Sequence, residues 1–137
     1  MKILICGIDG YIGYPLALHL LNRGHQVHGL DNYSRREVVK QAGSNSLTPI
    51  LDRREREVYL ESDKNFLDNV ARIDLSDHYL TNRVLSYFKP DAIVHLAEQP
   101  SAPWSMKDAR ASIDTQANNV IGTLSPVSYT HLTLPTN

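Results

Sequence analysis

The chain has 137 residues, 42% of them hydrophobic and 21% charged, with a net charge of −1, which indicates one globular domain or part of one. Basic residues are not in excess over acidic ones, so the composition gives no sign of nucleic acid binding. No apolar run reaches the roughly 20 residues that span a bilayer, so we expect no membrane partner and a cytoplasmic location. The six histidines show no metal-ligand spacing, so no metal is assigned, and the single Cys6 is expected to be a buried, inert thiol.

A strand, a glycine turn and a helix are predicted at the start of the chain. The apolar run of residues 3–6 stops at Gly7, glycine returns at Gly10 and Gly13, and a helical apolar pattern follows. In such a unit one glycine makes the turn, another lets the backbone approach a pyrophosphate, and a third lets the helix pack on the strand. Glycines at a strand-helix junction also occur without a ligand, so the flanking elements decide the interpretation.

The second predicted strand, residues 26–30, supplies that context. It ends in Asp31, about 20 residues beyond the glycines, where a carboxylate accepts hydrogen bonds from the adenosine ribose hydroxyls. The unit therefore predicts NAD as the cofactor, because a carboxylate at this position would repel a 2′-phosphate. Arg35 and Arg36 follow closely and weaken that preference.

Two short helices are predicted between the second strand and the next. Ser34 followed by Glu37 indicates a capping box that opens the first helix, and Gly43 could close it. Pro49 suits the first turn of the second helix, which would run to about Leu60. This excursion is longer than a crossover needs; it is either a solvated surface insertion or a lid or dimer contact near the adenosine.

A third strand over residues 69–73 and a fourth over 92–96 complete the predicted parallel sheet, whose crossovers are right-handed. Asp74 and Leu75 follow the third strand, at the edge where ligands of such sheets bind. Asp74 could accept from the adenine amino group while Leu75 covers the ring, and Asp74 could equally cap a helix over residues 76–88.

The polar, proline-rich loop after the fourth strand faces the nicotinamide side of the cofactor in this arrangement. Glu98, Gln99 and Ser101 are candidates to meet the nicotinamide ribose and the substrate, although such a loop is more often a connector. A last helix is predicted over residues 107–124. Its apolar stripe is expected to face the core and consists of Ala109, Ile113, Ala117, Val120, Ile121 and Leu124. Asn118 and Asn119 are poor helix formers, which hints that one of them meets a cofactor, a substrate or a neighbouring loop.

The segments GIDGYIG, DNYSRR, SLTPI, HLAEQPSAPWSM and NNVIGTL, in this order, resemble the N-terminal part of the UDP-sulfoquinovose synthase family of extended short-chain dehydrogenases. The first and last segments are shared among nucleotide-sugar epimerases and dehydratases, whereas SLTPI and EQPSAPWSM are more particular. The resemblance implies an α/β fold with a partial Rossmann-type doubly wound sheet. It also implies an NAD-dependent enzyme of sulfolipid biosynthesis that oxidises UDP-glucose at C4, eliminates water across C5 and C6, adds sulfite at C6 and returns the hydride.

Together with the residues already named, the resemblance implies a set of site residues in this chain. The cofactor set is Gly7, Gly10, Tyr11, Ile12, Gly13, Asp31, Asn32, Ser34, Arg35, Asp74, Leu75, Leu96, Ala97, Glu98 and Asn119. The substrate side is Gln99 and Ser101. The family commonly has arginine where this chain has Pro100, a departure that puts in doubt a basic contact to sulfite or to the sugar nucleotide.

The family's chemistry needs a Y-x-x-x-K pair, which the sequence lacks, so no catalytic residue is assigned within the chain and the fragment is expected to be inactive. The catalytic pair, the substrate domain and the contacts of a homodimer would lie beyond it. We expect residues 1–125 to be a partial NAD-binding domain. Residues 126–137 resemble a translated sequencing adapter and are expected to be a non-native, disordered tail. The alternatives are another NAD-dependent epimerase or dehydratase, such as a UDP-glucose 4-epimerase, and a non-catalytic NAD-sensing protein.

Overall fold

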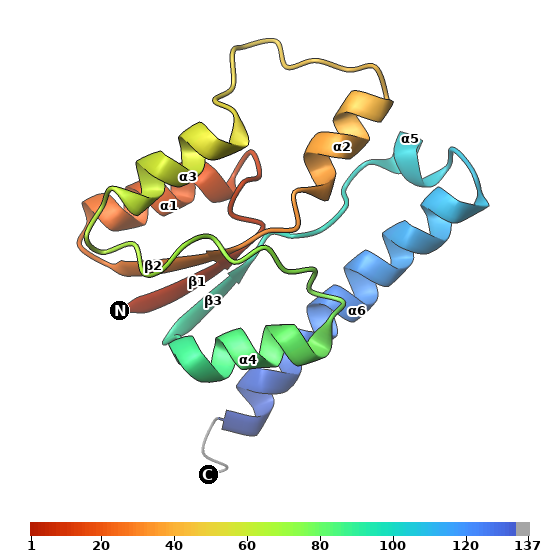
Figure 1. Ribbon diagram of the computed structural model, residues 1–137. Coiled ribbons are helices and arrows are strands. Elements are labelled where there is room, and N and C mark those ends of the chain that lie inside the picture. The colour runs from red at the N-terminus through yellow and green to blue at the C-terminus, as the bar shows by residue number, and fades with distance from the viewer. Residues whose placement is uncertain (134–137) are drawn as a thin grey trace.

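A three-stranded parallel sheet lies at the centre of the computed structural model, which describes residues 1–133 and their side chains through residue 131 (Figure 1). The strands are β1 (Lys2–Cys6), β2 (Gln26–Leu30) and β3 (Ala92–His95), in the order β2-β1-β3. In the parallel register Ile3 is opposite Val27 on one side and Ala92 on the other. The central position of β1 agrees with its apolar sequence, because a strand covered on both faces needs apolar side chains on both.

Helices cover both faces of this sheet, as predicted for an α/β fold (Figure 1). On one face lie α1 (Gly13–Asn22) and α3 (Arg53–Glu61), and on the other lie α4 (His78–Phe88) and α6 (Ala109–Thr133). The remaining two, α2 (Ser34–Gln41) and α5 (Ala102–Ser105), lie beyond the carboxyl ends of the strands. No helix within residues 1–133 is long and apolar enough to cross a membrane.

Two apolar cores result from the alternation of side chains along β1. Ile3 and Ile5 point into the core that α1 and α3 cover, while Leu4 and Cys6 point into the core beneath α4. All four side chains are at most 6% exposed. Each fully buried side chain of this size contributes about 1.5–3 kcal/mol relative to an exposed one, so both faces of the central strand hold the sheet in place.

The predicted third strand is not a continuous strand in the structure. Residues 66–71 run parallel to β2, but the pairing is limited to two isolated bridges, Val27 with Phe66 and Leu30 with Ala71. Between the bridges Asp68 has a φ of 59°, in the left-handed region, which interrupts the extended backbone. The prediction of a strand over residues 69–73 is therefore corrected to two short contacts that begin three residues earlier.

The first residue of α2 is Ser34, which therefore does not cap the helix as predicted. The N-cap position belongs to Tyr33, whose φ is 61° and whose side chain makes no capping hydrogen bond. The side chains of the two residues before it accept instead: Asp31 from the Tyr33 N–H at 2.7 Å and Asn32 from the Ser34 N–H at 2.9 Å. The predicted end of the helix is confirmed, because Gly43 has a φ of 64° and donates to the Lys40 carbonyl.

Helices α3 and α4 also begin later than predicted. Asp52 and Glu55 form a reciprocal capping box at the start of α3, so this helix begins at Arg53 and not near Pro49. For α4 the N-cap is Asp77, whose side chain accepts from the Leu80 N–H at 3.0 Å. Asp74 is therefore not the N-cap, and its carboxylate accepts hydrogen bonds from Asn32 and Ser76 instead.

Helix α6 turns a different face to the protein than its apolar stripe predicted. Among the helix residues up to 131, the buried positions are Ala111, Thr115, Gly122, Ser125 and Pro126. The predicted core residues Ile113, Val120, Ile121 and Leu124 are 65%, 55%, 45% and 56% exposed. Small residues let the helix approach closely, as Gly122 does at Leu75, and the same helical period fits either face.

The same helix continues beyond the predicted end of the native segment. Residues 126–133 belong to α6, so the expectation of disorder does not describe them. The physical reason is that Tyr129 packs against the core beneath α4, which gives this part of the helix a buried side. Residues 134–137 lie outside the described residues.

Candidate functional site

The glycine turn brings β1, the start of α1 and the loop after β3 together. Gly7 has a φ of 82°, and a Cβ there would lie 2.7 Å from the carbonyl carbon of Leu96, so no larger residue fits. A Cβ on Gly13 would lie 2.1 Å from the Gly7 oxygen, which explains how α1 approaches the strand so closely. At Gly10 the nearest atom would be the Gly7 oxygen at 3.1 Å.

The turn leaves the N-terminus of α1 without a capping side chain. Its N-cap residue, Ile12, makes no side-chain hydrogen bond to the first turn, and Tyr11 and Ile12 are 95% and 60% exposed. In the first turn the Tyr14 N–H already donates to the Gly10 carbonyl at 3.2 Å, and Pro15 has no N–H, so the positive end of the helix dipole is what this N-terminus offers to an anion such as a phosphate. This geometry fits the predicted pyrophosphate site.

Asp31 lies at the carboxyl end of β2 and is fixed by two backbone donors. Its Oδ2 accepts from the Asp9 N–H at 2.8 Å and its Oδ1 from the Tyr33 N–H at 2.7 Å. Burial raises the pKa of the Asp31 carboxyl above its usual range, against these two hydrogen bonds, which lower it. Each carboxylate oxygen can accept a second hydrogen bond, so two ribose hydroxyls can still donate to this group.

Two side-chain contacts join Asn32 and Arg35 to neighbouring loops at this edge of the sheet. Asn32 donates to Asp74 at 2.8 Å, and Arg35 donates to Gln99 Oε1 at 3.1 Å. Burial alone would raise the pKa of Asp74, but hydrogen bonds from Ser76 and Asn32 outweigh it and lower the pKa. Side chains that follow β2, the extended segment of residues 66–71 and β3 therefore contact one another, as expected for the carboxyl edge of a parallel sheet.

The loop after β3 is held by the two asparagines of α6. Asn118 donates to the Ala97 carbonyl at 3.0 Å. Asn119 contacts Gln99 twice: its Oδ1 accepts from the Gln99 N–H at 2.8 Å, and its amide donates to the Gln99 carbonyl at 3.2 Å. The hint from the sequence that an asparagine meets a neighbouring loop is confirmed, and here both do.

Glu98 lies in a small polar group between this loop and α6. Its Oε1 accepts from the Thr123 hydroxyl at 2.8 Å and lies 3.3 Å from His95 Nε2. Burial lowers the pKa of His95, against the charge of Glu98, which raises it. Lowering the pKa favours neutral His95, which can serve as a hydrogen-bonding partner in this group.

Three other predicted site residues have evident structural roles. Leu75 is 6% exposed and belongs to the core beneath α4. Ser101 is the N-cap of α5, where its hydroxyl accepts from the Trp104 N–H at 3.3 Å. Leu96 continues the chain from β3, and its N–H donates to the Cys6 carbonyl at 2.9 Å.

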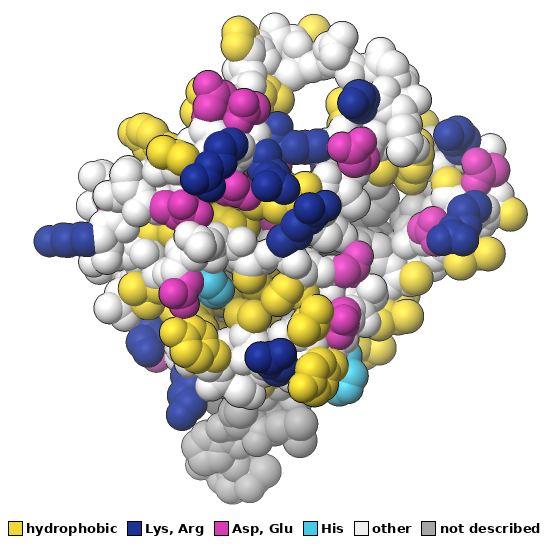
Figure 2. Space-filling view, in the orientation of Figure 1, with side chains coloured by type: hydrophobic (Ala, Val, Ile, Leu, Met, Phe, Trp, Pro, Cys, Tyr) yellow, Lys and Arg dark blue, Asp and Glu magenta, His cyan; other side chains and the backbone are white. Residues whose placement is uncertain are grey.

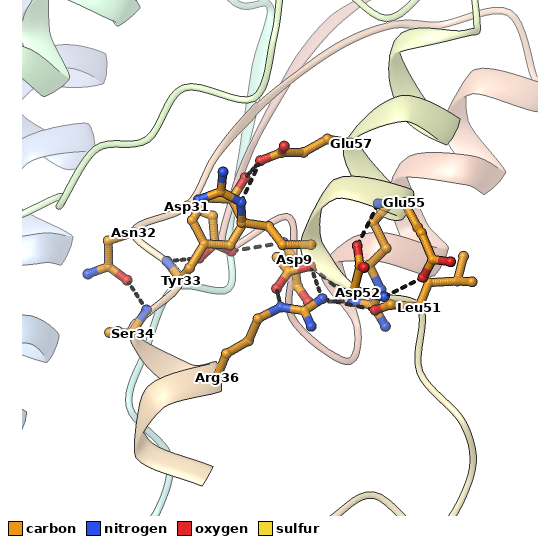
Figure 3. Close-up of polar contacts among 12 residues, drawn as sticks. Asp9, Asp31, Asn32, Tyr33, Ser34, Arg36, Leu51, Asp52, Glu55 and Glu57 are labelled. Carbon is orange, nitrogen blue, oxygen red and sulfur yellow. Dashed lines mark hydrogen bonds and ion pairs between the residues drawn. The ribbon is translucent and has the colours of Figure 1, made fainter. Parts of the chain in front are cut away.

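A charged cluster around Asp9 was not predicted from the sequence. The carboxylate of Asp9 pairs with Arg36 of α2 at 2.5 and 2.8 Å (Figure 3). It also pairs with Arg56 of α3 at 3.3 Å. Arg56 also donates to the Asp9 carbonyl at 2.6 Å. Figure 2 shows basic and acidic side chains gathered over α3. No spacing rule in the sequence could have revealed this contact, because Asp9 and Arg56 are 47 residues apart.

The same cluster holds α2 and α3, the two helices between β2 and the next extended segment, close to the glycine turn. Glu57 of α3 accepts from the Tyr33 hydroxyl at 2.6 Å (Figure 3). Tyr33 follows Asp31 and Asn32 directly in the sequence. The guanidinium of Arg53 lies 4.8 Å from the centre of the Tyr33 ring. Helix α3 therefore packs beside the predicted adenosine site and, through the buried Leu60, against the core, so it is not a wholly solvated insertion. A lid or a dimer contact at this place stays a prediction.

Neither the cysteine nor a cluster of metal-binding side chains offers a reactive group within the described residues. Cys6 is fully buried, and burial, with a smaller contribution from Asp31, raises the pKa of its thiol to about 12. The prediction of a buried thiol is confirmed, and at neutral pH it is protonated and unreactive. Within the described residues no group of three or more potential metal-binding side chains comes together.

Comparison with known proteins supports the same interpretation. The sequence pattern of the NAD dependent epimerase/dehydratase family matches residues 3–132. Over 126 residues the chain is 41% identical to the UDP-sulfoquinovose synthase of Sulfolobus acidocaldarius, a match that covers 90% of this chain and 32% of that protein. It is 37% identical over 123 residues to the chloroplastic UDP-sulfoquinovose synthase of Spinacia oleracea, covering 90% of this chain and 26% of that protein.

Solved structures share the fold. The UDP-glucose 4-epimerase of Thermus thermophilus in complex with NAD superimposes with a TM-score of 0.61 at 26% identity, over 91% of this chain and 32% of that one. The chain thus spans about a third or less of the length of the proteins that it matches. The match confirms the predicted Rossmann-type arrangement.

Proposed function

The chain belongs to the NAD-dependent epimerase/dehydratase family, and on this premise we propose that it is the cofactor-binding N-terminal part of a UDP-sulfoquinovose synthase. The observation that carries the proposal is its 41% identity to such a synthase, across the segment that contains both the glycine turn and the loop after β3. Conversion of UDP-glucose and sulfite to UDP-sulfoquinovose would then be the activity of the longer protein.

The residues of the chain fit NAD at each part of the molecule. The glycine turn and the N-terminus of α1, which has no capping side chain, would hold the pyrophosphate, and Asp31 would accept from the adenosine ribose. Asp74, fixed by Asn32, would accept from the adenine amino group. Glu98, fixed by Thr123, would meet the nicotinamide ribose. When bound there, NAD would accept the hydride from C4 of the sugar and later return it.

On the substrate side the chain would orient the sugar and supply no base. Gln99 is fixed at its backbone by Asn119 and at its side chain by Arg35, so its amide has a defined direction. Such preorganisation lowers the entropic cost of placing a substrate for hydride transfer. The tyrosine and lysine that would move the hydroxyl proton are not in this sequence, so the proposal assigns them to the rest of the longer protein.

A hybrid protein tests this proposal. Residues 1–125 would replace the matching N-terminal third of the S. acidocaldarius synthase, whose unmodified form is the positive control. We expect bound NAD, and conversion of UDP-glucose only when sulfite is present, with mass spectrometry of the nucleotide sugar as the measurement. A hybrid that interconverts UDP-glucose and UDP-galactose and ignores sulfite would replace the synthase proposal by an epimerase.

Three parts of the proposal concern the longer protein and its setting. We propose a homodimer in the cytoplasm, with a UDP-sugar and a sulfite source as its small-molecule partners. We also propose that residues 126–137 are foreign to the enzyme, although α6 extends into them. A hybrid joined at residue 125 is expected to fold as well as one joined at residue 133, which differential scanning calorimetry would measure.

A further inference from the structure

Asp9 lies in the glycine turn, residues 7–13, and its carboxylate binds two arginines. Its two oxygens receive Arg36 Nε and Nη2, in a bidentate pair, and Arg56 Nη1 lies 3.3 Å from Oδ1. The side chain of Asp9 is 9% exposed, that of Arg56 14% and that of Arg36 32%. Ion pairs with this little exposure are weakly screened by salt, so both arginines are held firmly.

This cluster adjoins the group that would bind the ribose. The Asp9 N–H donates to Asp31 at 2.8 Å, while the Asp9 side chain turns away to the arginines (Figure 3). The hydrogen bond from Arg36 to Asp9, against the cost of burial, raises the pKa of Arg36, and the charge of Asp31 acts in the same direction. Arg36 is thus within electrostatic reach of the ribose position.

An arginine at that distance would ordinarily favour a 2′-phosphate, because its planar guanidinium binds phosphate oxygens in pairs. Here that surface of Arg36 is already occupied: Nε and Nη2 are paired with Asp9, and Nη2 also donates to the Leu51 carbonyl at 3.2 Å. Arg35 likewise donates to Gln99 Oε1 at 3.1 Å. The two arginines that the sequence sets against the NAD preference are therefore both engaged elsewhere.

We propose that Asp9 is a specificity-determining positioning residue, which occupies the Arg36 guanidinium and thereby excludes NADP from the cofactor site. The inference rests on the proposed function, because it presumes that NAD binds beside Asp31. Asp9 need not touch the cofactor. It acts through Arg36, whose guanidinium it keeps paired and so withholds from a 2′-phosphate.

The test is the ratio of the dissociation constants of NADP and NAD, measured by calorimetry on the 137-residue chain. In Asp9→Asn the ratio should fall about tenfold or more, because Arg36 gains a free donor pair for the 2′-phosphate. Asp9→Ser is a second neutral variant with a shorter side chain, in case one of them does not fold. Asp9→Glu, which keeps the charge, should retain most of the parent ratio.

Two further variants separate selectivity from general damage. Asp9→Asn combined with Arg36→Gln should lose the gain in NADP affinity, because the phosphate-binding group is then absent. Asp114→Asn removes one negative charge at a distant surface ion pair with Arg110, and its ratio should equal that of the parent.

The outcomes distinguish the two proposals. A parent chain that binds neither nucleotide contradicts the proposed function. A parent that prefers NAD, with an unchanged ratio in whichever neutral Asp9 variant retains the parent's circular dichroism and melting temperature, overturns the inference. A fall in the ratio that persists in the double variant overturns it as well, because Arg36 would then not be the responsible group.

Discussion

The backbone N–H of Asp9 donates a 2.8 Å hydrogen bond to the carboxylate of Asp31, which joins the glycine turn to the end of β2. The pyrophosphate and ribose parts of the proposed site are thus fixed relative to each other before any cofactor binds. A site that is preorganised in this way loses less entropy on binding than a flexible one.

Replacing Asp31 with alanine is expected to weaken NAD binding. The ribose hydroxyls would lose a charged acceptor, and hydrogen bonds to an ionised group are worth about 1.5–3 kcal/mol. Calorimetric titration of the chain measures the difference, and Asp114→Ala on the exposed face of α6 is the control for lost charge. Equal NAD affinity in the parent and in Asp31→Ala would remove Asp31 from the site.

The affinity for NAD is expected to fall when the pH is lowered, and to do so above the usual pKa range of an aspartate. Burial raises the pKa of Asp31, and only its charged form is a full acceptor for two hydroxyls. The effect on folding has the opposite sign: a raised pKa adds stability at low pH, and this contribution is lost as the pH rises through the folded-state value.

Titrations of NAD from pH 7 downward measure this dependence. Asp31→Asn keeps the shape of the side chain without its charge, so its affinity should be lower at pH 7 and nearly independent of pH. If the NAD affinity of Asp31→Asn still fell at low pH as that of the parent does, a group other than Asp31 would be titrating.

Gly13→Ala is expected to destabilise the fold, whereas Gly122→Ala is expected to stabilise it. The new methyl group at Gly13 would lie 2.1 Å from the Gly7 oxygen, and forced overpacking of this kind costs about 1–3 kcal/mol or more. At Gly122 the nearest atom is Leu75 Cβ at 3.4 Å, an ordinary contact, and alanine is favoured over glycine within a helix by about 0.5–1 kcal/mol. Urea unfolding of both variants gives the two free energies, and a tolerated Gly13→Ala would contradict the close packing of α1.

Asn119→Ala is expected to loosen the loop after β3. Both hydrogen bonds to the Gln99 backbone would be lost, and its N–H and carbonyl would have to find water. Hydrogen exchange at the Gln99 amide should become faster, while the β1 amides keep their protection. Gln116→Ala, at an exposed position of the same helix, is the matched control and should leave both unchanged.

The strands and the glycine turn could be predicted because their signals are local. β2 has the predicted bounds, 26–30, since the glycine after α1 and the acidic Asp31 mark its two ends locally. Gly7, Gly13 and Asp31 are recognised from spacing because a strand-turn-helix unit tolerates few alternatives at those positions.

The errors occur where tertiary contacts decide the outcome. The face of α6 that is buried depends on the small residues Thr115 and Gly122, which let it approach its neighbours, and an apolar stripe cannot reveal that. The contact between Asp9 and Arg56 depends on how α3 folds back, across 47 residues. The start of α3 was predictable after all, because Asp52 and Glu55 have the spacing of a capping box.

The pairing of β1 with β3 also constrains when the sheet can form. Lys2 and Asp91 are joined by hydrogen bonds of 2.7 and 2.8 Å across 89 residues. At a ribosomal rate of about 5–20 residues per second, β1 would wait roughly 4–18 s for this partner, because β3 is the last of the three strands to be translated. Closing so long a loop is also entropically costly. We therefore expect the glycine turn and Asp31, which need only β1 and β2, to assemble before β3 pairs with β1.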